Sequence, residues 1–130
     1  MFLIDTDISS YAIKSQHGIA AKLLTLQADE WGISVISYHE IAFGLSLQNL
    51  SVKVSENGPL FLASSTVFNF DSEAAQAAAF VRKTLRARGM PTGHFDSLIA
   101  GHALALDATL VSNNLKHFEN VSGLRVENWL

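Results

Sequence analysis

Acidic side chains stand at three places where a predicted strand gives way to a predicted helix. Asp5 follows an apolar stretch at 2–4, Glu40 follows a β-branched stretch at 33–36, and Asp96 opens an apolar helical stretch. Open α/β sheets bind ligands outside the carboxyl ends of parallel strands, so these carboxylates are expected to face one another there. Hard oxygen ligands, without cysteine or paired histidines, suit Mg²⁺ or Mn²⁺ better than Zn²⁺. A divalent ion held in this way is typical of enzymes that cut phosphodiesters.

Each of these acids also has a purely structural explanation. Asp5 can cap the next helix, and Asp96 can be a first-turn acid that interacts with the helix dipole. Glu40 lies three residues after Ser37, which matches the capping box, and here the structural and functional explanations are level. We favour metal binding for Asp5 and Asp96, because an acid recurs at three separate helix starts beside predicted strand ends.

Further polar residues lie near these acids in the sequence. Asp7 is predicted to be a helix cap or a group behind the metal ligands. Ser112, Asn113 and Asn114 follow the fourth predicted strand. Asparagine is common in turns, so a turn is one explanation, and orientation of water or substrate phosphate is the other.

The basic residues are concentrated near position 85, although the net charge is −3 and the pI is about 5.9. An excess of acidic over basic residues is unusual for a protein that binds nucleic acid. Arg82, Lys83, Arg86 and Arg88 fall within seven positions. They are either a solvated helix end whose cations complement the helix dipole or a contact for RNA phosphates, and the sequence leaves both open.

Other enzyme classes lack their signatures. His94, His102 and His117 show no zinc-binding spacing, and His102 lies in an Ala/Leu helix, where a packed, hydrogen-bonded role is favoured. The G-x-S-x-G motif of serine hydrolases and the G-x-x-x-x-G-K-[ST] phosphate loop are absent from the sequence.

The elements that must position these residues alternate along the chain. Strands are predicted at 2–5, 33–36, 66–70 and 109–112, with a short final strand at 124–126. Helices are predicted from Thr6 or Asp7 as cap, from 18 to about 28, from 37 to about 47, from Asp71 or Ser72 to about 88, and at 96–106. A turn is predicted at 57–59 and a loop at 89–93. This order predicts one α/β domain over residues 1–130, a three-layer α/β/α sandwich around a parallel sheet of four to five strands.

Composition indicates a soluble protein with a partner. Hydrophobic residues make up 48% and charged residues 16% of the 130 residues, so an apolar surface is expected. The N-terminus has no basic segment or cleavage site, and no apolar run is long enough to cross a membrane. We therefore expect a cytoplasmic location and no membrane association.

Four sequence blocks together resemble a known family. FLIDTDIS at 2–9 is similar to LLDTNxxS, ISYHEIAFG at 36–44 to ISxxTxxELxxG, and TGHFDSLIAGHA at 92–103 to GxxDxLIAAHA. LVSNN at 110–114, Phe118 and GLRVENW at 123–129 resemble the ending LVTNNxxxFxxxxGLxVENW. These patterns are those of the PIN-domain ribonucleases and, within them, of the VapC toxins of type II toxin–antitoxin pairs.

The resemblance implies that Asp5, Glu40 and Asp96 bind Mg²⁺ or Mn²⁺ in an endoribonuclease, which often cuts transfer RNA. It also implies a small antitoxin partner of VapB type. Together with the apolar surface, it leads us to expect a homodimer, larger assemblies with the antitoxin, and docking around 7–14 and 37–62. Two departures stand out: Asp7 replaces an asparagine, and where the family often has a fourth acid shortly after the fourth strand, this chain has Asn113, Asn114 and His117. Glu119 is nearby but does not line up with that acid. The number of metal ions is therefore left open.

Two alternatives from other classes were weighed. A phospho-acceptor receiver domain needs a lysine at the end of its fifth strand, and no suitable lysine exists, which argues against that class. A catalytically weak or inactive PIN-like module, which acts mainly by binding its antitoxin, is the stronger alternative. Metal-dependent cleavage of RNA separates it from the enzyme.

Overall fold

Five parallel strands form the centre of the protein. The computed structural model describes residues 1–90 and 93–130. In it the strands are β1 (Phe2–Ile4), β2 (Trp31–Ser34), β3 (Val67–Phe68), β4 (Thr109–Val111) and β5 (Arg125–Glu127), in the order β3-β2-β1-β4-β5. The central strand, β1, pairs with β2 on one side and β4 on the other, with Phe2 opposite Trp31 and Thr109. All carboxyl ends therefore lie at one edge of the sheet.

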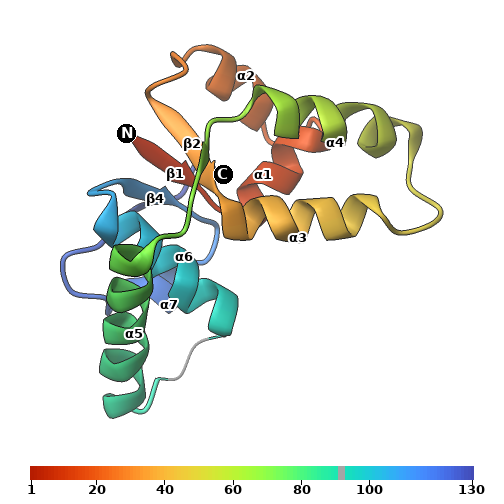
Figure 1. The fold of residues 1–130 in the computed structure, drawn as a ribbon. Coiled ribbons are helices and arrows are strands. Elements are labelled where there is room, and N and C mark those ends of the chain that lie inside the picture. The colour runs from red at the N-terminus through yellow and green to blue at the C-terminus, as the bar shows by residue number, and fades with distance from the viewer. Residues whose placement is uncertain (91–92) are drawn as a thin grey trace.

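Helices cover both faces of this sheet (Figure 1). They are α1 (Thr6–Ile13), α2 (Ile19–Leu24), α3 (Val35–Leu45), α4 (Val52–Ser64), α5 (Ser72–Ala87), α6 (His94–Ala105) and α7 (Leu115–Phe118). Neighbouring strand residues point to opposite faces. Accordingly, Leu3 packs with α5, α6 and α7, whereas Ile4 packs with α1, α2 and α3. The predicted three-layer α/β/α fold is confirmed, with five strands.

The second strand ends two residues earlier than predicted. The Ser34 hydroxyl accepts a hydrogen bond from the Ile36 N–H at 3.0 Å and caps α3, so Val35 and Ile36 are helical. The predicted helix start at 37 is therefore wrong, and the capping box that was one of the two explanations for Glu40 does not form, because Ser37 lies inside the helix. This removes the structural explanation for Glu40.

The first two helices also differ from their predictions. Asp5 caps α1, rather than Thr6 or Asp7, since its Oδ1 accepts the Ile8 N–H at 2.9 Å. Helix α2 ends at Leu24, earlier than the predicted 28. The cap of α5 is Asp71, as predicted.

Helix α4 runs through the predicted turn at 57–59 and contains Pro59. Two tertiary contacts explain the difference. The Asn57 side chain donates a hydrogen bond to the Ile13 carbonyl at 3.1 Å, and Gly58 packs so closely on Leu45 that a Cβ there would collide with it. Packing against α1 and α3 therefore overrides the local turn preference.

Helix α6 begins at His94, two residues earlier than predicted, and Asp96 lies in its first turn. Pro91 and Thr92 belong to the predicted loop 89–93, and Thr92 also starts one sequence block; both residues lie outside the described part of the chain. Helix α7 was not predicted. Among the residues that the structure describes, no helix is long and apolar enough to span a membrane.

Candidate active site

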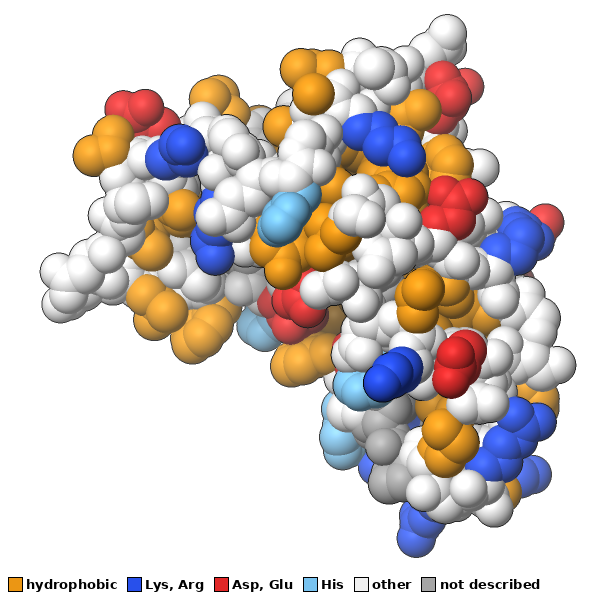
Figure 2. Space-filling model, turned by 180° about the vertical axis from the view of Figure 1, so that it is seen from behind, with side chains coloured by type: hydrophobic (Ala, Val, Ile, Leu, Met, Phe, Trp, Pro, Cys, Tyr) orange, Lys and Arg blue, Asp and Glu red, His pale blue; other side chains and the backbone are white. Residues whose placement is uncertain are grey.

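A small cavity of about 70 Å³ lies beside the carboxyl end of β1, where α1, α3 and α6 meet. Thr6, Ile99 and Phe118 form part of its wall. The acidic residues in its lining are Asp5, Asp7, Glu40 and Asp96. Figure 2 shows acidic and histidine side chains together in the hollow between the α3–α4 part and the α5–α6 part of the molecule. The fold thus brings together three acids that are distant in the sequence, and it adds Asp7 to them.

Asp5 follows an apolar strand and is held by a backbone hydrogen bond. One carboxylate oxygen accepts the Ile8 N–H at 2.9 Å, and the nearby Ser112 side chain acts to lower the pKa of the carboxyl. Burial nevertheless raises the pKa of Asp5 from 3.8 to about 6, and the charges of Asp7 and Asp96 add to this rise. Capping α1 uses only one oxygen, so the same carboxylate can cap the helix and serve the cavity.

Glu40 is oriented by Thr6, a residue that the sequence analysis did not assign to the site. The Thr6 hydroxyl donates to Glu40 Oε1 at 2.9 Å and also lies 3.0 Å from the hydroxyl of Ser37. Burial raises the pKa of Glu40, the Thr6 hydrogen bond opposes this effect, and Asp96 and Asp7 reinforce it. The position of Thr6, a hydroxyl residue directly after the strand-end Asp5, is the sequence feature that could have predicted its role in the site.

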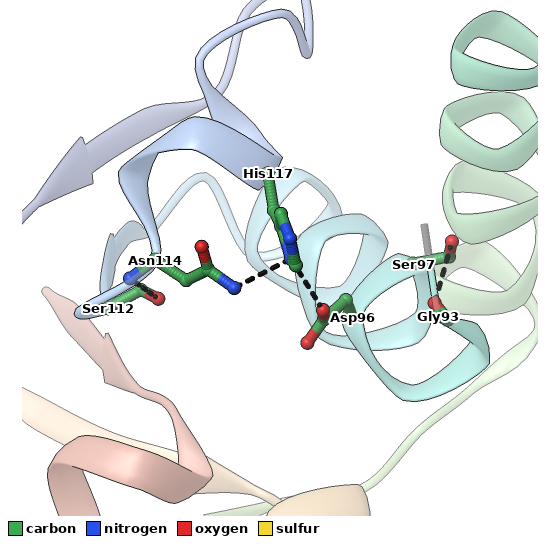
Figure 3. A network of polar contacts seen from close by, with 6 residues as sticks. All are labelled: Gly93, Asp96, Ser97, Ser112, Asn114 and His117. Carbon is green, nitrogen blue, oxygen red and sulfur yellow. Dashed lines mark hydrogen bonds and ion pairs between the residues drawn. The ribbon is translucent and has the colours of Figure 1, made fainter. Parts of the chain in front are cut away.

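Asp96 is linked to the segment after β4 (Figure 3). His117 Nδ1 lies 3.1 Å from Asp96 Oδ2 and 2.6 Å from the side-chain nitrogen of Asn114, whose backbone N–H donates to Ser112 Oγ at 3.0 Å. A single ring nitrogen cannot accept from Asn114 and donate to Asp96 at once, so these two groups compete for His117. This histidine stands in the region where the resembling family often has a fourth acid.

The remaining residues that the sequence suggested for the site or for RNA binding, Asn113 and the basic cluster, lie outside the cavity. Asn113 contacts Asn128 at 3.5 Å rather than the cavity. The basic cluster lies away from the carboxylates. Arg82, Lys83 and Arg86 line a separate groove between α5 and α6, whereas Arg88 donates to the Asn120 carbonyl at 2.8 Å.

His102 has the packed role expected for it. Its side chain is buried in α6, and its Nδ1 lies 2.8 Å from the hydroxyl of Ser34, the cap of α3. Burial lowers the pKa of His102, so its neutral form is favoured.

The chemistry of the cavity fits a divalent cation. Four carboxylates line it, and no lysine or arginine from the described residues joins them, so the negative charge lacks a counter-charge. Within residues 1–90 and 93–130, no three acidic or histidine side chains stand close enough to enclose a metal ion by themselves. Mg²⁺ usually keeps several waters and binds proteins through one or two carboxylates, which is compatible with this spacing.

Comparison with known families agrees with this architecture. The family model described as "PIN domain" matches residues 2–124. The chain belongs to the PIN-domain family. Within it, the chain belongs with the VapC ribonucleases: it is 30% identical to the tRNA(fMet)-specific endonuclease VapC of Shigella flexneri, over 98% of this chain and 97% of that protein. It is also 31% identical to ribonuclease VapC2 of Rickettsia felis, over 99% and 98% of the two chains.

Solved structures of VapBC complexes share the fold of this PIN domain. The VapBC2 structure from Rickettsia felis, bound to a DNA fragment from its promoter, matches with a TM-score of 0.88 and covers 99% of this chain and 98% of that chain. DNA-bound VapBC from Salmonella typhimurium matches with a TM-score of 0.84 at 30% identity, with coverage of 99% and 98%.

Proposed function

We propose that this VapC-family protein is a metal-dependent endoribonuclease, the toxin of a toxin–antitoxin pair, and that Asp5, Glu40 and Asp96 bind Mg²⁺ or Mn²⁺, partly through water. One observation carries the proposal: three acids from separate segments line one cavity that contains no basic side chain from the described residues. The names of the relatives as ribonucleases support RNA as the substrate, and the Shigella flexneri relative supports transfer RNA.

The protein's own groups have distinct tasks in this proposal. Asp5 is held by the Ile8 N–H and Glu40 by the Thr6 hydroxyl, so both carboxylates are set in place before substrate arrives. When bound, the divalent ion supplies an acidified water for in-line attack and offsets charge on the transition state. His117 lies beside Asp96 and Asn114 lies beside His117, so these two side chains can hold water or a substrate phosphate oxygen near Asp96.

An antitoxin of VapB type is the proposed partner, and a groove of about 710 Å³ between α1, α2 and α4 is its proposed docking surface. The groove is apolar, and two of its leucines, Leu24 and Leu60, are 86% and 68% exposed. Such a surface suits the apolar face of an amphipathic helix. It overlaps the expected segments 7–14 and 37–62 and adds α2, while the VapBC complexes that share the fold support the type of partner.

A homodimer is also proposed, on the strength of a second apolar surface. Phe43 and Leu47, at the C-terminal end of α3 and just beyond it, are 61% and 53% exposed, and Tyr38 lies exposed on the same helix. Light scattering of the purified protein tests this proposal, because a monomer at micromolar concentration would contradict it.

Two substitutions test the site. Asp5→Asn and Asp96→Asn should each abolish RNA cleavage, because each removes a metal ligand, while circular dichroism should show an unchanged fold. The exposed Asp29 provides a matched control, and Asp29→Asn should cleave like the wild type. Normal cleavage by either site variant would refute the metal assignment.

The alternative is that the protein is a catalytically weak or inactive PIN domain that acts mainly by binding its antitoxin. It is supported by the lack of an acidic residue in the segment 112–118 after β4. It predicts tight complex formation with the antitoxin and no metal-dependent cleavage of RNA by the free protein.

A further inference from the structure

Helices α5 and α6 touch at two small residues and leave a groove beside the contact. Gly101 packs against the backbone of Ala78 so closely that a Cβ at Gly101 would collide with it. A groove of about 620 Å³ lies between α5 and the first turns of α6, where His94 and Leu98 form one wall. Its volume is in the range of sites that hold one small ligand, far less than the volume that a nucleic-acid duplex occupies.

The other wall of this groove carries unpaired positive charge. Arg82, Lys83 and Arg86 line it, are exposed, and form no ion pair or side-chain hydrogen bond within the described part of the chain. Figure 2 shows Lys and Arg side chains gathered at the end of the α5–α6 part of the molecule.

Three cations elsewhere in the structure have partners. Arg125 pairs with Asp107 at 3.1 Å, and Lys22 lies 4.2 Å from the centre of the Trp129 ring. The Arg88 guanidinium donates a hydrogen bond to the Asn120 carbonyl. The three groove cations are therefore available to an anionic ligand.

Between these cations the groove floor is apolar. Ala75 and Ala79 are exposed on α5, and Leu98 faces them from α6. A row of small side chains leaves room for a flat ring, and the cations at the rim can reach charged oxygens attached to it. The described lining contains no Phe, Tyr or Trp, and the imidazole of His94 in the wall is its one aromatic ring, so base stacking makes a small contribution in this groove.

The groove and the carboxylate cavity share one turn of α6. Asp96 lines the cavity, whereas His94 and Ser97 line the groove. Because Asp96 and Ser97 are consecutive, the two sites lie on neighbouring faces of one helix, separated by roughly its 10 Å diameter. An extended polynucleotide with one phosphate at the carboxylates can therefore continue over the groove.

We propose that the α5–α6 groove binds the nucleotides of a single-stranded RNA segment adjacent to the bond that is cut. Arg82, Lys83 and Arg86 contact backbone phosphates, and the alanine floor with Leu98 takes the apolar face of a sugar or base. This inference rests on the proposed function and adds the path of the substrate. Because the contacts are to phosphate and to an apolar surface, the groove contributes affinity with little base preference.

Binding of a labelled single-stranded oligoribonucleotide of about 12 nucleotides, followed by fluorescence anisotropy in EDTA over a salt series, tests the groove. The groove variant is Arg82→Gln/Arg86→Gln, and the matched control is Lys14→Gln/Lys53→Gln, from exposed positions outside the groove. Both double variants change the formal charge from −3 to −5, since each loses two positive charges. Ala79→Asp, which places a negative charge on the floor, is a second groove variant.

The groove variant should bind roughly tenfold more weakly at low salt, and its salt slope should fall by about 1.4, since each phosphate contact to a single strand contributes about 0.7. The control should keep the wild-type slope, and Ala79→Asp should weaken binding. Equal slopes in the groove variant and the control would overturn the proposal. So would loss of antitoxin binding by the groove variant with unchanged RNA affinity, which would make the groove a protein contact.

Cleavage kinetics separate this inference from the proposed function. With saturating RNA and Mg²⁺, the groove variant should keep its kcat while its KM rises, because the groove supplies binding that is equal in ground state and transition state. Normal metal-dependent cleavage with an unchanged KM would reject the groove and keep the ribonuclease. If RNA binding depends on the groove but the wild type cleaves no RNA, the groove remains an RNA-binding site and the proposed ribonuclease activity is refuted.

Discussion

Replacement of Asp5 by asparagine is expected to stabilise the metal-free protein at neutral pH while abolishing its activity. Burial raises the pKa of this carboxyl from 3.8 to about 6. At about 1.4 kcal/mol per pKa unit, the ionised carboxylate costs the folded state up to about 3 kcal/mol. Asparagine removes this cost and is as good a helix cap as aspartate, so the Ile8 hydrogen bond can be kept.

The sign of the pH dependence follows from the direction of the pKa change. The folded state holds the proton of Asp5 more tightly than the unfolded state, so the associated stability is fully present below pH 3.8 and is lost as the pH rises through about 6. The asparagine variant lacks this group. Its advantage should therefore be largest above pH 7 and should vanish near pH 4.

Urea unfolding in EDTA at pH 4 and pH 7.5 measures this difference, with Asp29→Asn as the control for loss of an exposed acid. At pH 7.5 the Asp5→Asn variant should be more stable by 1–3 kcal/mol, about 3–5 °C in Tm for each kcal/mol. Mg²⁺ should then stabilise the wild type and leave the variant unchanged. A less stable variant at pH 7.5, or a difference independent of pH, would refute the account of a strained carboxylate.

Three further substitutions test which side chains act in catalysis and which contribute only to the packing of the fold. Glu40→Gln should lower the cleavage rate by about a hundredfold without lowering the Tm, because burial raises the pKa of Glu40 and the neutral amide avoids that cost; full activity would return Glu40 to a structural role. Thr6→Val should lower activity by roughly tenfold by releasing Glu40, and a change in thermal stability without a change in kcat would contradict this. Gly101→Ala should cost about 1–3 kcal/mol in chemical unfolding because α6 must move away from Ala78, and a neutral effect would show that the two helices are not in close contact.

The sequence predicted the site best where a candidate acid stands directly beside a clear apolar strand or helix pattern. Asp5 and Asp96 stand next to apolar stretches whose length and composition define the elements, and the parallel sheet then brings them together. The stretch 33–36 was misassigned in part because β-branched residues suit a strand, while the decisive signal was the Ser34 hydroxyl that caps α3. Pro59 was misassigned because only packing with α1 and α3 keeps α4 continuous.

Side-chain contacts across the fold were beyond prediction from spacing alone. The link between His117 and Asp96 joins residues 21 positions apart and depends on α7, a four-residue helix without a clear sequence pattern. In the basic cluster, Arg82 and Arg86 are four residues apart and share a helix face. Arg88 follows the last turn and turns to Asn120 instead. The sequence shows that these cations are close together, and only the fold shows which of them face the groove.

The central claim is that the carboxylate cavity cuts RNA with a divalent metal ion, and the most direct measurement is cleavage of transfer RNA by the purified protein, freed of antitoxin. The reaction is followed in EDTA, after addition of Mg²⁺ or Mn²⁺, and with Asp96→Asn in parallel to exclude a contaminating nuclease. The account predicts defined fragments only for the wild type and only with added metal. Cleavage in EDTA, equal cleavage by Asp96→Asn, or intact RNA under every condition would contradict it.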